Sequence, residues 1–169
     1  LDIKENDSVL DFGCGPGVIL AFIETKGLKI GVDVSSGMLK RAIYNNSSRD
    51  IFLLDKHIPV FSKVDHVICY SVLHYLSSQE YAVKIVESMK RISDSILIMD
   101  IPDLDKKEVR EMNRRRLGLP DKPSHLYFDK KFFQDFGFKT FDNEVCITKN
   151  AKYGFTALYK KEKYYELYE

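Results

Sequence analysis

The chain has 169 residues, a length that predicts one domain whose core needs neither a disulfide nor a metal. Apolar residues make up 44% of it, too many for a disordered chain. The 26 Lys and Arg residues against 25 Asp and Glu leave a net charge of +1, which argues against a dedicated nucleic-acid binder.

Cysteine usage and the lack of targeting signals indicate a cytoplasmic protein. Cys14, Cys69 and Cys146 fit neither a disulfide framework nor a Cys-x-x-Cys metal pair, so we expect reduced thiols and no metal site. The longest apolar runs fall short of the roughly 20 residues that span a bilayer. The first residues show no signal-peptide pattern. We therefore expect no membrane partner.

Short apolar runs alternate with helical patterns over the first two thirds of the chain. Strands are expected at Ser8–Phe12, Leu28–Val34, Ile51–Leu54, His66–Tyr70 and Ser95–Ile101. Helices are expected at Val18–Thr25, after the N-cap Ser35, and after a capping box formed by Ser77 and Glu80. Strands that alternate with helices predict an α/β fold with a mostly parallel sheet covered on both faces.

The last third of the chain has a different pattern. Helices are expected at Asp105–Leu117 and at Asp129–Phe136, where Gly137 ends the second one. Two β-like runs then follow with no helix between them, Phe138–Thr148 and Tyr153–Lys160. Consecutive strands of this kind predict an antiparallel hairpin at one edge of the sheet.

A glycine-rich turn, Gly13 to Gly17, follows the first strand and lets a ligand approach the backbone closely. Asp33 lies 22 residues after Asp11, at the end of the next strand, where a carboxylate can accept hydrogen bonds from two ribose hydroxyls. Val18 stands where the dinucleotide fingerprint has its last glycine, so a nicotinamide-dependent dehydrogenase ranks last. The acidic Asp11 suits a cationic ligand better than a pyrophosphate.

The stretch from Asp11 to Gly17 resembles the first motif, D-x-G-x-G-x-G, of class I S-adenosylmethionine-dependent methyltransferases. Other stretches are similar to later parts of that family at the family's spacing: Gly31–Ser35 with Met38, Leu54-Asp55, Asp65–Leu76 and Gly137-Phe138. The resemblance implies a Rossmann-like seven-stranded sheet of order 3-2-1-4-5-7-6 with the last strand antiparallel. It implies one domain over residues 1–160, followed by a charged, Tyr-rich tail over 161–169.

The resemblance also implies S-adenosyl-L-methionine as cofactor and S-adenosyl-L-homocysteine as product. It places Asp11 near the cofactor's ammonium group, Asp33 on the ribose hydroxyls and Asp55 on the adenine amine. The other residues implied to contact the cofactor are Gly13, Cys14, Gly15, Gly17, Val34, Met38, Leu54, Tyr70 and Ser71. In the alternative interpretation, Asp33 and Asp55 only end strands or cap helices.

Methyl transfer requires mainly the alignment of acceptor, methyl group and sulfur. His74, just after the fourth strand, is the candidate general base, and the alternative is a packing role. His125, Tyr127 and Asp103 lie where the family binds its acceptors. The segment Asp105–Arg116, with six cations and three acids, is either a solvated helix face or a clamp for an acidic acceptor.

The leading hypothesis is methyl transfer to a small molecule, on oxygen and with an acidic or sugar-type acceptor. The stretch Asp65–Leu76, which is similar to the family's fourth motif, lacks the Asn/Asp-Pro-Pro-Tyr/Phe sequence typical of amino-group methylation, and we expect no nucleic-acid partner. The second hypothesis is a catalytically silent S-adenosylmethionine-binding module or regulatory partner. The chain begins at Leu1, almost at the first strand, so an N-terminal cap over the cofactor is expected to be missing.

Overall fold

The computed structural model describes residues 1–58, 63–119, 125–143 and 151–161. Seven strands form one sheet in the order β3-β2-β1-β4-β5-β7-β6. The strands are β1 (Val9–Phe12), β2 (Lys29–Asp33), β3 (Ile51–Leu54), β4 (His66–Tyr70), β5 (Ser95–Pro102), β6 (Lys139–Asp142) and β7 (Gly154–Lys160). β1 to β5 pair in parallel, whereas β7 is antiparallel to both β5 and β6. The expected order and the antiparallel last strand are confirmed.

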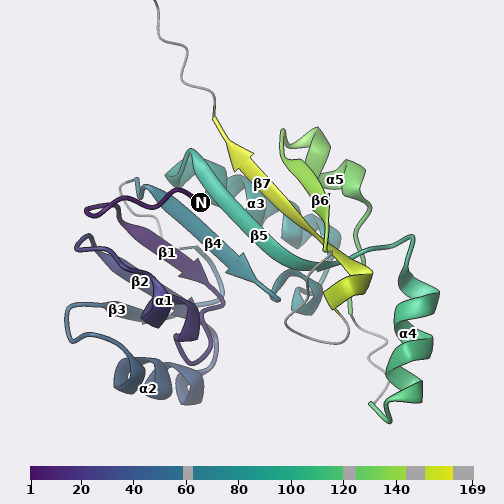
Figure 1. Cartoon of the computed structure of the whole chain (residues 1–169), viewed down its shortest axis with the longest axis horizontal. Coiled ribbons are helices and arrows are strands. Elements are labelled where there is room, and N and C mark those ends of the chain that lie inside the picture. The colour runs from purple at the N-terminus through teal and green to yellow at the C-terminus, as the bar shows by residue number, and fades with distance from the viewer. Residues whose placement is uncertain (59–62, 120–124, 144–150, 162–169) are drawn as a thin grey trace, which may run out of the picture.

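Five α-helices and two short 3-10 helices connect the strands in the described part of the chain (Figure 1). They are α1 (Val18–Phe22), α2 (Ser36–Asn45), η1 (Leu73–Tyr75), α3 (Gln79–Ile92), α4 (Lys107–Arg116), α5 (Lys130–Asp135) and η2 (Ala151–Tyr153). α3 and α5 pack on one face of the sheet, and α1 and α2 pack on the other. α4 lies apart from the sheet, beyond its edge (Figure 1).

The core has one part on each face of the sheet. On the α3 face, Ile85 and Met89 are buried in a cluster with strand residues such as Val67 and with Phe133 of α5. The smaller cluster on the other face includes Leu20 of α1 and Leu39 of α2. Strands buried on both faces explain why the central sequence runs are continuously apolar.

Side-chain caps fix where several helices begin. Ser35 Oγ accepts a hydrogen bond from the Met38 amide at 3.3 Å, so α2 begins where the sequence predicts it. The predicted cap of α3 is wrong by one residue: Ser78, not Ser77, accepts from the Tyr81 amide at 3.2 Å. Ser77 lines a cavity instead.

Other element boundaries also differ from the sequence prediction. α1 ends at Phe22 because Ile23 is already extended, three residues earlier than expected. α4 begins at Lys107 rather than Asp105, because a hydrogen bond from the Asp105 amide to the Asp103 side chain holds a turn before it. The predicted strand Phe138–Thr148 is β6 over Lys139–Asp142, and its remaining part beyond residue 143 lies outside the described residues.

Candidate cofactor and active site

A cavity of about 580 Å³ opens at the carboxyl ends of the parallel strands. Cofactor sites commonly have about 300–1,000 Å³, and open α/β sheets bind ligands at this edge, where the strand order reverses. Its walls come from the ends of β1 and β2, from the segments that follow β1, β2, β3 and β4, and from the first turn of α3. The lining residues are Phe12, Gly13, Gly15, Val32, Asp33, Val34, Ser35, Met38, Asp55, Lys56, Ser71, Val72, Tyr75, Leu76, Ser77 and Tyr81.

Two glycines of the loop after β1 are required by their backbone conformation. Gly13 has φ +75°, and a Cβ atom there would lie 2.2 Å from a Val72 methyl carbon. Gly15 has φ +52°, and a Cβ atom there would have no neighbour within 4 Å. Gly15 therefore presents bare backbone to open space, and a ligand can approach the main chain there.

Asp33, at the end of β2, holds the glycine loop against its own strand. Its Oδ2 accepts a hydrogen bond from the Gly15 amide at 2.9 Å, and its Oδ1 accepts from the Ser35 amide at 2.8 Å. An ionised carboxylate has about four acceptor positions, so two remain for other donors. The two interpretations of Asp33 are thus compatible, because an aspartate that fixes the loop can also accept from a ligand in the cavity.

Asp11 is a buried carboxylate behind the glycine loop. Asp11 is 1% exposed, and neither of its carboxylate oxygens has a hydrogen-bond partner among the described residues. Burial, and to a lesser extent the negative charge of Asp33, raise the pKa of Asp11 to about 7. A nearby cation would stabilise the ionised form of this group, as expected for a residue that faces an ammonium ligand.

Polar contacts also arrange the segment after β3. Asp55 Oδ1 accepts a hydrogen bond from the His57 amide at 2.9 Å, which holds the pKa of Asp55 below its ordinary value. The Tyr81 hydroxyl donates to the Lys56 carbonyl at 2.7 Å, and burial raises the pKa of Tyr81. This hydrogen bond ties α3 to the segment after β3 across the cavity wall.

The predicted cofactor residues divide into two groups in the structure. Those that line the cavity are Gly13, Gly15, Asp33, Val34, Met38, Asp55 and Ser71. Those that do not line it are Asp11, Cys14, Gly17, Leu54 and Tyr70. Cys14 is buried with its sulfur close to Gly31, Gly17 caps α1 beside Asn46, and Leu54 is exposed to solvent.

Several cavity residues were missed by sequence reasoning, above all the aromatic residues Phe12, Tyr75 and Tyr81. Tyr81 lies in the first turn of α3, three residues after the cap Ser78. This position at the start of the helix is the sequence signal that could have indicated Tyr81 as a cavity residue. Tyr75 ends η1, a single turn that periodicity does not reveal.

The candidate base His74 is not among the residues that line the cavity. It is 3% exposed, and its ring lies 4.2 Å from the Tyr75 ring and 4.7 Å from the His125 ring, centroid to centroid. The Tyr75 and His125 rings are 4.8 Å apart, so His125 adjoins a residue that does line the cavity. These contacts fit the packing alternative for His74.

The other residues expected near the acceptor are buried or paired. Asp103 is 2% exposed, with its carboxylate 3.7 Å from the ammonium groups of both Lys106 and Lys130. Tyr127 is buried, and the Lys107 ammonium lies 5.4 Å from the centre of its ring. The basic segment is therefore partly neutralised by neighbouring groups rather than uniformly solvated.

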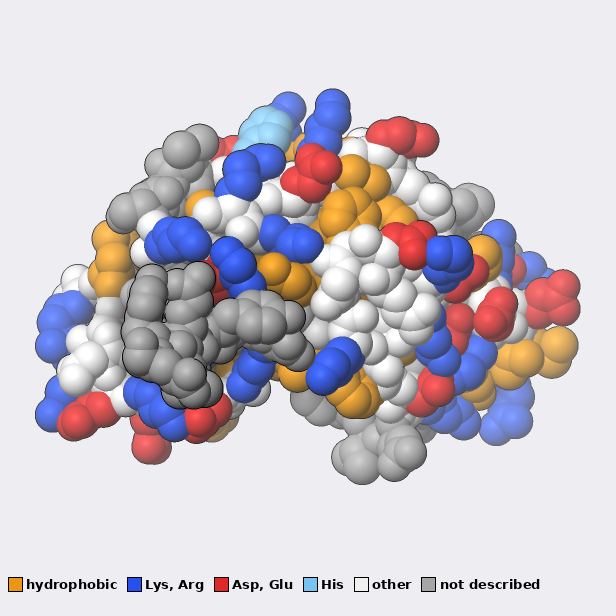
Figure 2. Space-filling view, turned by 90° about the horizontal axis from the view of Figure 1, so that it is seen from above, with side chains coloured by type: hydrophobic (Ala, Val, Ile, Leu, Met, Phe, Trp, Pro, Cys, Tyr) orange, Lys and Arg blue, Asp and Glu red, His pale blue; other side chains and the backbone are white. Residues whose placement is uncertain are grey.

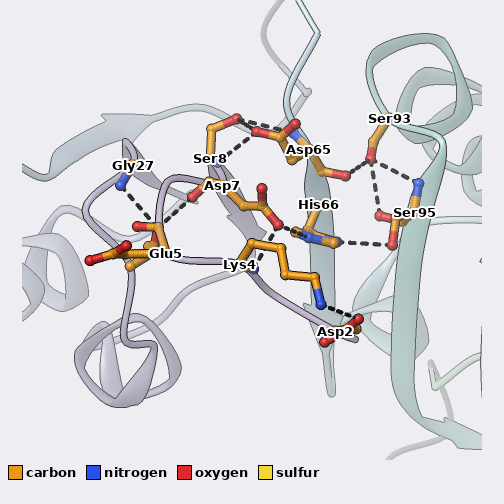
Figure 3. A network of polar contacts seen from close by, with 11 residues as sticks. Asp2, Lys4, Glu5, Asp7, Ser8, Gly27, Asp65, His66, Ser93 and Ser95 are labelled. Atoms are coloured by element: carbon orange, nitrogen blue, oxygen red, sulfur yellow. Dashed lines mark hydrogen bonds and ion pairs between the residues drawn. The ribbon is translucent and has the colours of Figure 1, made fainter.

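A second polar network lies at the opposite, amino ends of the strands (Figure 3). The His66 ring contacts Asp7 Oδ2 through Nε2 and Ser95 Oγ through Nδ1, both at 2.9 Å. Asp7, His66 and Ser95 are the residue types of a catalytic triad, which also needs a free N–H group to stabilise an oxyanion beside the serine. The Ser95 amide already donates to Ser93 Oγ, so it is not free for that role. We assign this network a structural role: it ties the N-terminal segment to β4 and β5.

The face at these amino ends holds a second cavity, of about 470 Å³. Its charged lining residues are of both signs: the acidic Asp2, Asp7, Asp65 and Asp94 and the basic Lys63, Lys160 and Lys161. Basic and acidic side chains are interspersed across the face in Figure 2. Such mixed charge does not indicate a nucleic-acid surface, which requires many cations of one sign.

Three further expectations concern thiols, metals and membranes. Cys14 and Cys69 are buried free thiols, and Cys146 lies outside the described residues. Within the described ranges, no group of three or more His, Cys, Asp or Glu side chains is arranged to hold a metal ion. In the same part of the chain, no helix has the length and apolar character needed to cross a bilayer.

A sequence profile of the family described as "Methyltransferase domain" matches residues 9–94, slightly more than half of the chain. The chain belongs to this methyltransferase family. The matched segment contains the glycine loop, Asp33, Asp55 and all of α3, so the family's defining region coincides with the cavity. The resemblance to class I S-adenosylmethionine-dependent methyltransferases is thereby confirmed.

Among curated methyltransferases, the ribosomal protein L11 methyltransferase of Thermotoga petrophila is 32% identical over 110 residues. That match covers 63% of this chain but only 40% of the relative, so the chain corresponds to less than half of that protein. The curated relatives as a group are matched over 37–40% of their own length.

Solved methyltransferase structures share the fold at low identity. The N-methyltransferase NodS from Bradyrhizobium japonicum WM9 has a TM-score of 0.69 at 12% identity, with 93% of this chain and 86% of that chain covered. Magnesium protoporphyrin IX methyltransferase from Synechocystis PCC 6803, solved with S-adenosylhomocysteine, has a TM-score of 0.63 at 20% identity, covering 91% and 73%. These likenesses confirm the Rossmann-like methyltransferase fold.

Proposed function

We propose that this chain binds S-adenosylmethionine in the carboxyl-edge cavity and transfers its methyl group to an oxygen atom of a small molecule. The observation that carries this proposal is the pairing of Asp33 with the glycine loop at the entrance to the cavity. The loop leaves Gly15 open to a ligand, and Asp33 keeps acceptor positions for ribose hydroxyls.

The residues present fit this cofactor in its three parts. Asp11 is a buried carboxylate without a hydrogen-bond partner in the described part of the chain, and its charge would attract the ammonium group from behind the glycine loop. Asp33 would hold the ribose. Val34, Met38 and Asp55 would contact the adenine. Val34 is 70% exposed and Met38 is 40% exposed, so both have apolar surface that a ligand would cover.

The chemistry of methyl transfer makes few demands on the protein. When bound, S-adenosylmethionine supplies a methyl group on a sulfonium, which is a good leaving group. The chain must bring the acceptor into line and exclude water, which is positioning work. Ser71, Val72 and Tyr75 border the cavity after β4 and would form the wall nearest the acceptor. No His lines this cavity as described, so we propose alignment rather than proton removal by His74.

The acceptor class rests on charge and sequence. The net charge of +1 and the mixed surface charge disfavour nucleic acid, and the chain lacks the motif typical of amino-group methylation. The curated relative from Thermotoga petrophila is named for a ribosomal protein, and the solved structure from Synechocystis PCC 6803 is named for a porphyrin. The acceptor test therefore compares small molecules with a protein acceptor.

We also propose that residues 1–160 form a single methyltransferase domain.

Calorimetric titration with S-adenosylmethionine, S-adenosylhomocysteine and NAD tests cofactor binding. We expect saturable binding of both sulfur ligands and none of NAD. Asp33→Asn should weaken binding by about 10- to 100-fold, because it removes charge-assisted hydrogen bonds worth about 1.5–3 kcal/mol. The matched control is Asp135→Asn, at an exposed residue on α5 that pairs only with Lys131 among the described residues. Equal loss in both variants, or no binding by the unmodified chain, would overturn the proposed site.

Mass spectrometry of methylated products then tests the acceptor. Phosphorylated sugars and phenolic acids form one set, and ribosomal protein L11 forms the other. A methyl ether or ester product supports oxygen transfer to a small molecule, and modification of L11 contradicts it. Cofactor binding with no product from any acceptor would instead support the catalytically silent binding module.

A further inference from the structure

Besides the contact of Lys107 with the Tyr127 ring, α4 has one buried polar side chain that faces the sheet. Arg110 is the sole buried residue of this helix and is 5% exposed. Val109 and Met112 beside it are 53% and 68% exposed, so apolar packing does not hold α4 in place. Figure 1 shows α4 standing away from the sheet. Arg110 is therefore a buried link between α4 and the sheet.

Arg110 faces Asp100 near the end of β5. Arg110 Nη2 lies 4.0 Å from Asp100 Oδ1, an ion pair but not a hydrogen bond, which needs about 2.7–3.2 Å. Arg110 Nη1 and Asp100 Oδ1 are buried, and neither has a hydrogen-bond partner among the described residues. A buried ion pair that lacks its hydrogen bonds is incompletely compensated for desolvation. A shift of about 1 Å would complete it.

Asp100 is in turn joined to the cavity. Ser71 Oγ donates a hydrogen bond to Asp100 Oδ2 at 2.7 Å, and Ser71 lines the cavity. Within the described ranges, Ser71 (φ +58°) and Asp100 (φ +54°) are the two residues other than glycine with positive φ. Residues other than glycine rarely adopt this conformation, and they persist in it where the surroundings fix them. Here the two strained residues hold each other.

We propose that Asp100 and Arg110 are positioning residues that couple the cofactor cavity to α4. A ligand in the cavity restrains Ser71, Ser71 fixes Asp100 through its hydrogen bond, and Asp100 draws Arg110 and α4 inward. The helix is then ordered when the cofactor is bound. This inference rests on the proposed function, because it needs S-adenosylmethionine or its product in that cavity.

Hydrogen–deuterium exchange of the α4 amides, measured with and without S-adenosylhomocysteine, tests the coupling. We expect saturating ligand to slow exchange in Lys107–Arg116 about 5-fold or more, the lower end of typical coupling between sites. Asp100→Asn and Arg110→Met should abolish this slowing and weaken ligand binding by no more than the same factor, because coupling between two sites is reciprocal. Arg110→Lys, which keeps the charge, should restore part of the response.

The control Arg116→Met removes a cation from the exposed end of the same helix and should leave the response unchanged. A purely structural role would change α4 exchange equally with and without ligand, so the ligand-dependent difference is the decisive readout. If Asp100→Asn fails to fold, Arg110→Met still tests the contact from outside the sheet. Ligand binding without slowing of α4, or slowing retained in Arg110→Met, overturns the inference alone. Absence of ligand binding in calorimetry overturns the proposed function, and the inference with it.

Discussion

Replacing Asp11 by asparagine should make the protein's stability less dependent on pH. Because burial raises the pKa of Asp11 to about 7, the folded chain holds a proton on this group that the unfolded chain releases near pH 4. Stability from this group is fully present below pH 4 and is lost as the pH rises to about 7. The neutral amide of the Asp11→Asn variant would carry no such dependence.

The magnitude follows from the pH interval. Between pH 5 and pH 7 the unfolded Asp11 is ionised, whereas the folded one is protonated at pH 5 and about half protonated at pH 7. At 1.36 kcal/mol per unit, and with the folded group half ionised at pH 7, the unmodified chain should lose about 2 kcal/mol relative to Asp11→Asn over this interval. Above pH 8 the difference should be constant.

Urea unfolding of both proteins at pH 5, 6, 7 and 8, without ligand, measures this difference. Subtraction removes the titration of the four histidines, which both proteins share. The buried amide of Asp11→Asn changes the free energy of unfolding by the same amount at every pH, so it does not affect the pH dependence of the difference. Asp135→Asn, at an exposed position, should differ from the unmodified chain by a constant amount over the same range. A flat difference for Asp11→Asn would refute the claim that Asp11 is protonated in the folded chain.

Three further outcomes are expected. S-Adenosylhomocysteine should bind more tightly as pH rises from 5 to 7, by up to about 10-fold per pH unit. The reason is that the ammonium group of the ligand favours the ionised form of Asp11, so calorimetric titration of Asp11→Asn should show no such trend. Gly15→Ala should lower the free energy of unfolding by about 1–2 kcal/mol through its positive φ, and calorimetry should show ligand binding lost because the methyl group fills open space at the loop. Phe133→Ala, on the buried face of α5, should cost about 3–5 kcal/mol in urea unfolding; a loss below 1 kcal/mol would contradict the packing described.

Local signals in the sequence were sufficient for most of the fold. The runs Ile51–Leu54 and His66–Tyr70 are strands with the predicted bounds, because each is a short apolar segment between polar or turn-forming residues. Ser35 caps α2 because its hydroxyl satisfies a free amide three residues later, a purely local effect. The strand order came from the family resemblance rather than from periodicity.

What each polar residue does was decided by contacts between distant segments. Asp11 is predictable as a motif residue, but its raised pKa arises from burial between β2 and β4, which only the assembled sheet produces. Ser71 and Asp100 are 29 residues apart, and they meet because β4 and β5 are adjacent strands. His74 has the sequence position of a base, yet the folded chain packs it against Tyr75 and outside the cavity lining. Sequence periodicity determines which residues form a strand or helix, whereas desolvation and pairing depend on neighbours that the tertiary structure brings together.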